Sequence, residues 1–257
     1  MRVNVDKIKV FLRSNLFFLF FVGGILFFAA IILLSVPLIS NAKRRYIVHI
    51  WSRYNCFILA LICGLKVRVE GLEKLPPPPY MILSKHQSAW ETVTIQAFFP
   101  DVILVLKKSL LKIPVFGWAL RFTGQIAIDR SQGVSALRLM AKKCKETFDQ
   151  NRTVMIFPEG TRVSPGEVGK YNPGGVGIAL STGVPIVPIA HNAGEFWAPK
   201  AYYKKPGEIQ MRIGPAIPTT GLGKGDRKEV NNKVKDTIEG MMEEIAKESA
   251  SNGSVVE

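Results

Sequence analysis

The stretch YMILSKHQSAWET, residues 80–92, joins an apolar run to a segment that carries a histidine and a glutamate. The run at 80–83 is typical of a buried strand, because it is short, apolar and followed by polar residues. Residues five apart on a regular helix are turned by about 140° from each other, so His86 and Glu91 would not share a helix face. They meet most easily when His86 lies in a strand-to-helix loop and Glu91 lies in the first turn of the helix, which Ser88 can cap.

In this geometry the His86–Glu91 pair can serve base catalysis. Glu91 can accept a hydrogen bond from one imidazole nitrogen and leave the other nitrogen as a stronger base. The same pair can also be an ordinary contact at a helix start, so a second signal has to decide. The chain contains no GxSxG motif, and no serine or cysteine of residues 84–92 has the setting of a nucleophile. If His86 acts as a base, we expect the substrate to carry the nucleophile.

A second signal is TVMIFPEGTR at 153–162, where a β-rich run ends in a turn with Pro158 and Gly160. Such a turn projects backbone N–H groups, and Arg162 adds a planar, permanently charged fork, so the arrangement suits a phosphate. Glu159 cannot favourably face a phosphate, and we expect it to orient Arg162 or to close the loop. The alternative is an ordinary Pro-Gly turn with a solvated arginine.

Short β-rich runs alternate with helical segments from residue 66 onward. The runs are KVRVE, YMIL, VILVL, QIAID, TVMIF, VPIVPIA and IQMRIG. Between two of them, residues 134–148 predict a helix, with Leu137, Met140, Ala141, Cys144 and Phe148 on its apolar stripe. The alternation predicts an α/β fold, with a mostly parallel or mixed central sheet of about seven strands covered by helices. We expect a last helix at 227–247 and a disordered tail, SASNGSVVE, at 249–257.

The N-terminal part predicts a membrane-associated helical hairpin. Residues 16–39 carry no charge, and as a helix they would reach about 36 Å, enough for a bilayer core. KRRY follows instead of a small-residue cleavage site, which argues against a signal peptide. A second helix is expected at 46–65, with a narrow polar or small stripe, and Gly23, Gly24 and Pro37 are candidate bend points. Basic residues flank the first segment on both sides, so the helices can span the bilayer or lie in one leaflet.

Three segments are therefore expected. Residues 1–65 form the membrane-associated helices, 66–220 form the α/β domain, and 221–257 form a C-terminal helix and tail packed on that domain or trailing from it. The formal charge of +14 favours an anionic partner. We expect no nucleic acid, because the cations form no single tract. We also expect no metal, because the three cysteines and three histidines show no zinc-site spacing.

Taken together, the motifs resemble the glycerolipid acyltransferase family, and most closely its bacterial 1-acyl-sn-glycerol-3-phosphate (lysophosphatidic acid) acyltransferases. Four blocks carry the resemblance in the family's order: KHQSAWE at 85–91, KKSLLKIPVFGWALRFTGQIAIDR at 107–130, FPEGTR at 157–162 and VPIVPIA at 184–190. The family usually has an aspartate where this chain has Glu91. The extra methylene lengthens the reach of the carboxylate by about one bond while its chemistry is kept.

The resemblance implies transfer of a fatty acyl chain from an acyl carrier protein or coenzyme A thioester to the sn-2 hydroxyl of lysophosphatidic acid, giving phosphatidic acid. It implies no other cofactor and no acyl-enzyme. His86 would take the hydroxyl proton, and Glu91 would orient it and stabilise the imidazolium. A loop N–H or Lys107 would stabilise the oxyanion, although Lys107 can equally be a solvated surface lysine.

The resemblance also implies an acceptor pocket and an acyl-chain channel. Glu159, Gly160, Thr161 and Arg162 would bind the acceptor phosphate. Arg130 is a further candidate, with an ion pair to Asp129 as its alternative. Apolar residues of LLKIPVFGWAL at 110–120 would line the channel, although Phe116 and Trp118 are of types more often found in a plain core.

The expected location is the bacterial inner membrane, with the catalytic domain on the cytoplasmic side and membrane phospholipid as a partner. Two alternatives stay open from the sequence. The acceptor can be another lysophospholipid or a lyso-aminolipid. From a different class, the chain can be a non-catalytic lipid-binding protein that keeps the fold.

Overall fold

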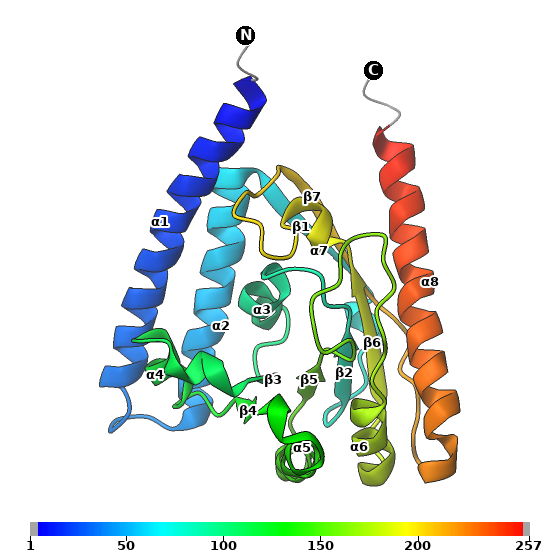
Figure 1. The fold of residues 1–257 in the computed structure, drawn as a ribbon. Coiled ribbons are helices and arrows are strands. Elements are labelled where there is room, and N and C mark those ends of the chain that lie inside the picture. Colours follow the sequence, from blue (N-terminus) through cyan, green and yellow to red (C-terminus); the bar gives the residue numbers. More distant parts are fainter. Residues whose placement is uncertain (1–4, 254–257) are drawn as a thin grey trace.

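The computed structural model describes residues 5–253, and its centre is one seven-stranded sheet (Figure 1). The strands are β1 (Leu65–Glu70), β2 (Met81–Ser84), β3 (Ile103–Lys107), β4 (Ile126–Ile128), β5 (Val154–Ile156), β6 (Ile186–His191) and β7 (Gly207–Ile213). Their order is β1-β7-β6-β2-β5-β3-β4, and all neighbours are parallel except β6 and β7. The predicted α/β fold is confirmed, and each of the seven β-rich runs overlaps one strand.

The central strands are apolar throughout because helices cover both faces of the sheet. Side chains alternate between the faces along β2, so Met81 and Leu83 join one core cluster while Ile82 joins another. The first cluster includes residues of α5 (Gly133–Phe148), α6 (Gly174–Thr182) and α8 (Arg227–Gly253). The second includes residues of α1 (Val5–Leu34), of α3 (Trp90–Thr94) and of α7 (Ala193–Phe196).

Short 3-10 turns connect several of these elements. They are η2 (Leu72–Lys74), η3 (Ile95–Ala97), η4 (Lys108–Lys112), η5 (Arg130–Gln132) and η6 (Lys224–Asp226). The predicted helix at 134–148 is α5, and its expected stripe holds at Cys144 and Phe148, which are buried. Leu137 also belongs to the expected stripe, but its side chain is 43% exposed and is not part of the core.

The C-terminal helix is longer than the sequence suggests. α8 runs to Gly253, so the expectation of disorder is wrong for residues 249–253, and residues 254–257 lie outside the described part. Apolar residues of α8 are buried as far as Ile245. Glu244, next to Ile245, and Glu248, one turn further on, both pair with Arg212 of β7. These ion pairs fix the last turns of α8, whose composition alone does not predict a helix.

Two antiparallel helices precede the sheet (Figure 1). They are α1 and α2 (Asn41–Ile58), and a π-helical turn, η1 (Leu59–Cys63), continues α2. By length and composition, α1 and the continuous helical segment of α2 and η1, Asn41–Cys63, could each cross a membrane. α1 continues unbroken through Gly23 and Gly24, so these are not bend points, and the chain reverses around Pro37 instead. Gly24 serves close packing, because a Cβ there would lie 2.6 Å from the ring of Tyr54.

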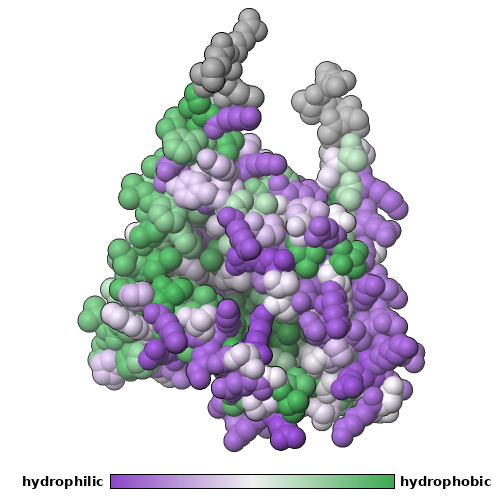
Figure 2. All heavy atoms as spheres, viewed as in Figure 1, coloured by the Kyte–Doolittle hydropathy of each residue, from purple (hydrophilic) through white to green (hydrophobic). Residues whose placement is uncertain are grey.

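One side of the hairpin packs on the protein and the other side is open. Ala29, Ile32, Val48 and Trp51 form a cluster with Ala119 of α4 (Phe116–Leu120). The outward side of α1 exposes eleven large apolar residues, namely Ile8, Phe11, Leu12, Leu16, Phe18, Leu19, Phe20, Leu26, Phe27, Ile31 and Leu34. They appear as the green surface along α1 (Figure 2). The apolar surface suggests that this side meets the membrane.

The basic residues after the first helix are partly used inside the protein. Arg44 is buried and its Nε donates to the carbonyl of Phe122 at 2.8 Å. Arg45 is also buried and its Nε lies 2.7 Å from Oδ1 of Asp101. These two cations therefore tie the hairpin to the domain. They are not available to lipid headgroups, so fewer basic residues flank the first helix at the surface than the sequence suggests.

Candidate active site

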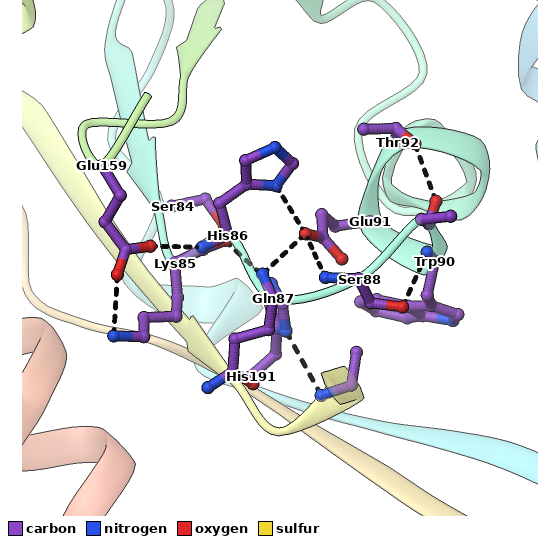
Figure 3. Close-up of polar contacts among 12 residues, drawn as sticks. Ser84, Lys85, His86, Gln87, Ser88, Trp90, Glu91, Thr92, Glu159 and His191 are labelled. Carbon is purple, nitrogen blue, oxygen red and sulfur yellow. Dashed lines mark hydrogen bonds and ion pairs between the residues drawn. The ribbon is translucent and has the colours of Figure 1, made fainter. Parts of the chain in front are cut away.

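His86 and Glu91 meet at the carboxyl end of β2, as the sequence predicts. His86 lies in the loop after the strand, and Glu91 lies in the first turn of α3 (Figure 3). Nδ1 of His86 is 2.6 Å from Oε1 of Glu91. The backbone N–H groups of Gln87 and Ser88 donate to the same oxygen at 2.9 and 2.8 Å. Ser88 also caps the turn, because its hydroxyl accepts from the N–H of Trp90 at 3.1 Å.

The carboxylate of Glu91 stays charged although it is fully buried. Burial alone would raise the pKa of Glu91, but the hydrogen bonds from His86 and Ser88 outweigh it, so this pKa lies below its ordinary value. A charged carboxylate only accepts hydrogen bonds, so it keeps the proton of His86 on Nδ1. Nε2 of His86 is then free to act as a base.

The ring of His86 is fixed by the second motif. It stacks on Phe157 with the ring centroids 4.1 Å apart and the planes 15° from parallel. The side chain is 12% exposed and lines a cavity. The imidazole is therefore held on one edge by Glu91 and on one face by Phe157, with its remaining surface toward the cavity.

A second histidine, His191, lies behind the loop and was not singled out from the sequence. It ends β6 and is fully buried, with Nε2 2.9 Å from the carbonyl of Lys85. A carbonyl only accepts, so Nε2 carries the proton. Burial lowers the pKa of His191, although Glu91 and the Lys85 carbonyl act in the opposite direction. A neutral His191 thus supports the backbone just before His86, and a lone histidine at a strand end gives no signal of this.

Lys85 is also fully buried and joins the two motifs to the C-terminal helix. Its Nζ lies 2.9 Å from Oε1 of Glu159 and 2.8 Å from Oε1 of Glu239 in α8. The hydroxyl of Tyr171 donates to the same Glu239 oxygen at 2.7 Å. No sequence pattern predicts this network, because its members are far apart along the chain.

Of the two roles expected for Glu159, the structure supports closing of the loop and not orientation of Arg162, and it does not support the phosphate contact that the resemblance implied. Its carboxylate is buried, pairs with Lys85 and accepts the backbone N–H of His86 at 2.8 Å (Figure 3). It does not line the cavity, and within residues 5–253 it makes no ion pair with Arg162. The physical reason is that a lysine from the other motif neutralises it inside the protein. It therefore holds the loops together and does not face a phosphate.

A cavity of about 620 Å³ opens beside His86. The remaining predicted polar site residues line it, namely Lys107, Arg130, Gly160, Thr161 and Arg162. Apolar side chains of α1, α2, β3 and α4 line the rest, including Ile25, Ala29, Val48 and Leu104. One space thus combines a base, cations and an apolar channel.

The loop at 160–162 is suited to an anion. Gly160 has a φ of +71°, which favours glycine, and its carbonyl accepts from Nη1 of Arg130. Arg130 therefore does not pair with Asp129, which instead accepts from the backbone and hydroxyl of Ser131. In the described part of the chain, the N–H groups of Thr161 and Arg162 have no acceptor and Arg162 has no ion-pair partner. These donors are available to a phosphate.

Lys107 ends β3 and is exposed at the cavity wall, without an ion pair among the described residues. Further along the same block, Leu110, Phe116, Ala119 and Leu120 line the apolar part of the cavity, as expected for 110–120. Trp118 is no core residue, since its side chain is 49% exposed. Among the described residues, no group of three or more His, Cys, Asp or Glu is placed to hold a metal ion.

Comparison with known proteins identifies the family. A family model described as Acyltransferase matches residues 66–192. The chain is 39% identical to the 1-acyl-sn-glycerol-3-phosphate acyltransferase of Pseudomonas aeruginosa, over 91% of this chain and 92% of that protein. The chain belongs to the acyltransferase family. This acyltransferase is also 28% identical to human 1-acyl-sn-glycerol-3-phosphate acyltransferase alpha, over 91% of this chain and 83% of the human protein.

A solved structure supports the fold of this acyltransferase. The crystal structure of the 1-acyl-sn-glycerophosphate acyltransferase from Thermotoga maritima is similar with a TM-score of 0.79. The similarity covers 94% of this chain and 98% of that chain, at 24% sequence identity. The arrangement of hairpin and sheet is therefore one that an acyltransferase is known to have.

Proposed function

We infer that the protein transfers a fatty acyl chain to the sn-2 hydroxyl of 1-acyl-sn-glycerol-3-phosphate and so makes phosphatidic acid. The observation that carries this inference is the single cavity that joins His86, the anion-suited loop at 160–162 and an apolar channel. A lysophosphatidic acid needs all three, because it has a hydroxyl to deprotonate, a phosphate to bind and a chain to shelter. The relatives named above support the same acceptor.

The reaction follows from the positions of the side chains. Nε2 of His86 removes the proton of the acceptor hydroxyl, and the oxygen attacks the carbonyl carbon of the thioester. Glu91, 2.6 Å from Nδ1, stabilises the imidazolium that forms. The tetrahedral intermediate carries its negative charge near Lys107, and its collapse expels the thiolate, which takes the proton back from His86.

Arg162 and Arg130 fix the acceptor by its phosphate. Among residues 5–253 no carboxylate pairs with the guanidinium of Arg162, and Arg130 holds the loop through the carbonyl of Gly160. The backbone N–H groups of Thr161 and Arg162 add two donors. The acceptor chain and the donor chain lie in the apolar part of the cavity, against α1, α2 and α4.

The donor is a thioester of acyl carrier protein or coenzyme A, and no further cofactor takes part. Both carriers are acidic, which agrees with the formal charge of +14. The protein lies at the inner membrane of a bacterium with the catalytic domain on the cytoplasmic side, where such thioesters are made. The apolar outward side of α1 supports the membrane attachment.

A product assay tests the proposal. The purified protein is given acyl-carrier-protein or coenzyme A thioesters together with lysophosphatidic acid, lysophosphatidylethanolamine or monoacylglycerol. Thiol release and mass spectrometry of the lipid products are followed. We expect phosphatidic acid as the main product and little reaction with monoacylglycerol, which lacks the phosphate. Preference for lysophosphatidylethanolamine would show that the acceptor is another lysophospholipid. Lipid binding without thiol release would show that the protein is a non-catalytic lipid-binding protein.

A further inference from the structure

A short segment beside the cavity exposes apolar side chains on its outer side. We call residues 108–122 the α4 segment; it contains η4 and α4. Ile113, Trp118 and Phe122 are 43%, 49% and 37% exposed, and none of them lines the cavity. The other three tryptophans of the chain are each 8% exposed or less. An exposed tryptophan among exposed aliphatic and aromatic side chains is typical of a contact surface.

The same segment is cationic. Lys108, Lys112 and Arg121 are all exposed, and residues 107–128 contain no acidic residue. Within residues 5–253 the two lysines make no ion pair, and Arg121 donates only to the carbonyl of Leu111 at 3.1 Å. Asp129 lies just beyond this range, and the charges of both lysines, after the hydrogen bonds from Ser131, help to lower its pKa. Apolar side chains interleaved with unpaired cations match the chemistry of an anionic bilayer surface, where tryptophan sits at headgroup level and long cations reach the phosphates.

The α4 segment also continues a surface that already suggests lipid contact. Ala119 packs against Ala29 and Ile32, so α4 lies on the C-terminal half of α1 (Figure 1). In that half α1 exposes Phe27 and Leu34. The α4 segment therefore lies next to the half of α1 that exposes these apolar side chains.

We propose that the α4 segment is a third membrane-contacting element, which inserts Ile113, Trp118 and Phe122 into the interface of an anionic phospholipid bilayer. Lys108, Lys112 and Arg121 bind the lipid phosphates there. The inner side of the segment lines the cavity through Leu110, Phe116 and Leu120. The segment is thus the wall between bilayer and cavity, and a lipid substrate enters past it directly from the membrane.

Close packing between α4 and η4 fixes the shape of the α4 segment. A Cβ on Gly117 would lie 2.5 Å from the carbonyl oxygen of Leu110, so only glycine allows α4 to rest on the backbone of η4. This contact presents the inner side chains to the cavity and the outer side chains away from it. The two sides can therefore be tested separately, by substitutions that leave the cavity lining intact.

The first test measures the depth of Trp118 and does not depend on activity. The full-length protein is placed in bilayers of phosphatidylcholine and phosphatidylglycerol, in which part of the lipid is brominated either high or low on its chains. The difference between wild type and Trp118→Phe isolates the fluorescence of Trp118. We expect strong quenching by lipid brominated near the headgroup. Quenching by aqueous acrylamide alone would overturn the proposal, and a Trp118 signal that responds only to acyl carrier protein would assign the surface to that protein instead.

The second test asks whether the contact serves lipid entry, and this part rests on the proposed function. The triple variant Ile113→Ser, Trp118→Ser, Phe122→Ser is compared with Leu72→Ser, Leu139→Ser, Leu222→Ser, whose side chains are similarly exposed but lie outside the α4 segment and the cavity lining. We expect the first triple variant to raise the KM for long-chain lysophosphatidic acid in vesicles several-fold. The KM for a short-chain, monomerically dissolved acceptor should stay unchanged. Equal losses with both acceptors, or no loss, would contradict entry past this segment, while absence of any acylation by wild type would refute the proposed function alone.

Discussion

Nζ of Lys85 lies 2.9 Å from Oε1 of Glu159, and both side chains are almost completely buried. The pair joins the loop that carries His86 to the loop that carries Arg162. The other oxygen of Glu159 accepts the backbone N–H of His86 at 2.8 Å. The base and the phosphate loop are therefore held at a fixed separation by one ion pair and one hydrogen bond, both out of reach of solvent.

Removal of the lysine should destabilise the fold. Lys85→Met leaves Glu159 and Glu239 buried without their cation, which costs about 3–5 kcal/mol. For a chain of this size that corresponds to a decrease of roughly 6–20 °C in thermal midpoint. Lys143→Met is the matched control, because Lys143 pairs with Glu146 on the surface of α5 and such pairs contribute about 1 kcal/mol or less. Equal midpoints for the two variants would show that the buried pair does not support the fold.

The catalytic pair can be tested by turnover measured beside thermal midpoint. His86→Ala should abolish nearly all transfer, and Glu91→Gln should lower kcat by about 10²- to 10⁴-fold, the range of general base catalysis. Glu91→Asp should retain measurable activity, because the charge is kept and only the reach shrinks. If activity per folded molecule hardly changes in the three variants, the pair is a structural contact. A well-folded His86→Ala protein with near-normal turnover would exclude His86 as the base.

The role of Arg162 should appear in one KM only. Arg162→Ala removes a charged hydrogen bond worth about 1.5–3 kcal/mol, so the KM for lysophosphatidic acid should rise about tenfold or more. The KM for the thioester donor should change little. Arg138→Ala provides the comparison, because Arg138 is exposed on α5 and does not line the cavity. Equal increases for both substrates would identify Arg162 as a structural residue.

The buried His191 should make stability depend on pH. Its pKa in the folded protein is below the ordinary 6.5, so below pH 6.5 the unfolded chain binds a proton that the folded chain does not. Stability should then decrease as pH falls from 6.5 to 5, by up to about 1.4 kcal/mol per pH unit. Glu91 affects stability at lower pH than His191 does. The pKa of Glu91 is lowered in the folded protein, so its contribution to stability is lost only as pH falls below 4.5.

His191→Gln provides the check on that dependence. Glutamine can still donate to the carbonyl of Lys85, and it has no titration in this range. Thermal midpoints of wild type and variant are measured between pH 5 and 7.5. We expect a flatter curve for the variant, and an unchanged slope would assign the dependence to other groups.

The sequence alone predicted what depends on neighbours along the chain. The seven strands, the apolar hairpin and the contact between His86 and Glu91 all follow from local periodicity and from a strand-to-helix turn. The anion-suited loop at 160–162 follows from its glycine and arginine in the same way. Each of these features is built within a few residues, so its pattern is visible before the fold is known.

Only the tertiary structure decided which charges are neutralised inside and which side chains face out. Glu159 was expected to orient Arg162 or to close the loop, and only the structure shows that Lys85, from a loop more than seventy positions earlier, neutralises it. Trp118 was expected to be of a core type, yet it faces outward at the cavity wall. In both cases burial and pairing depend on segments that meet only when the sheet assembles, and no spacing along the chain encodes that meeting.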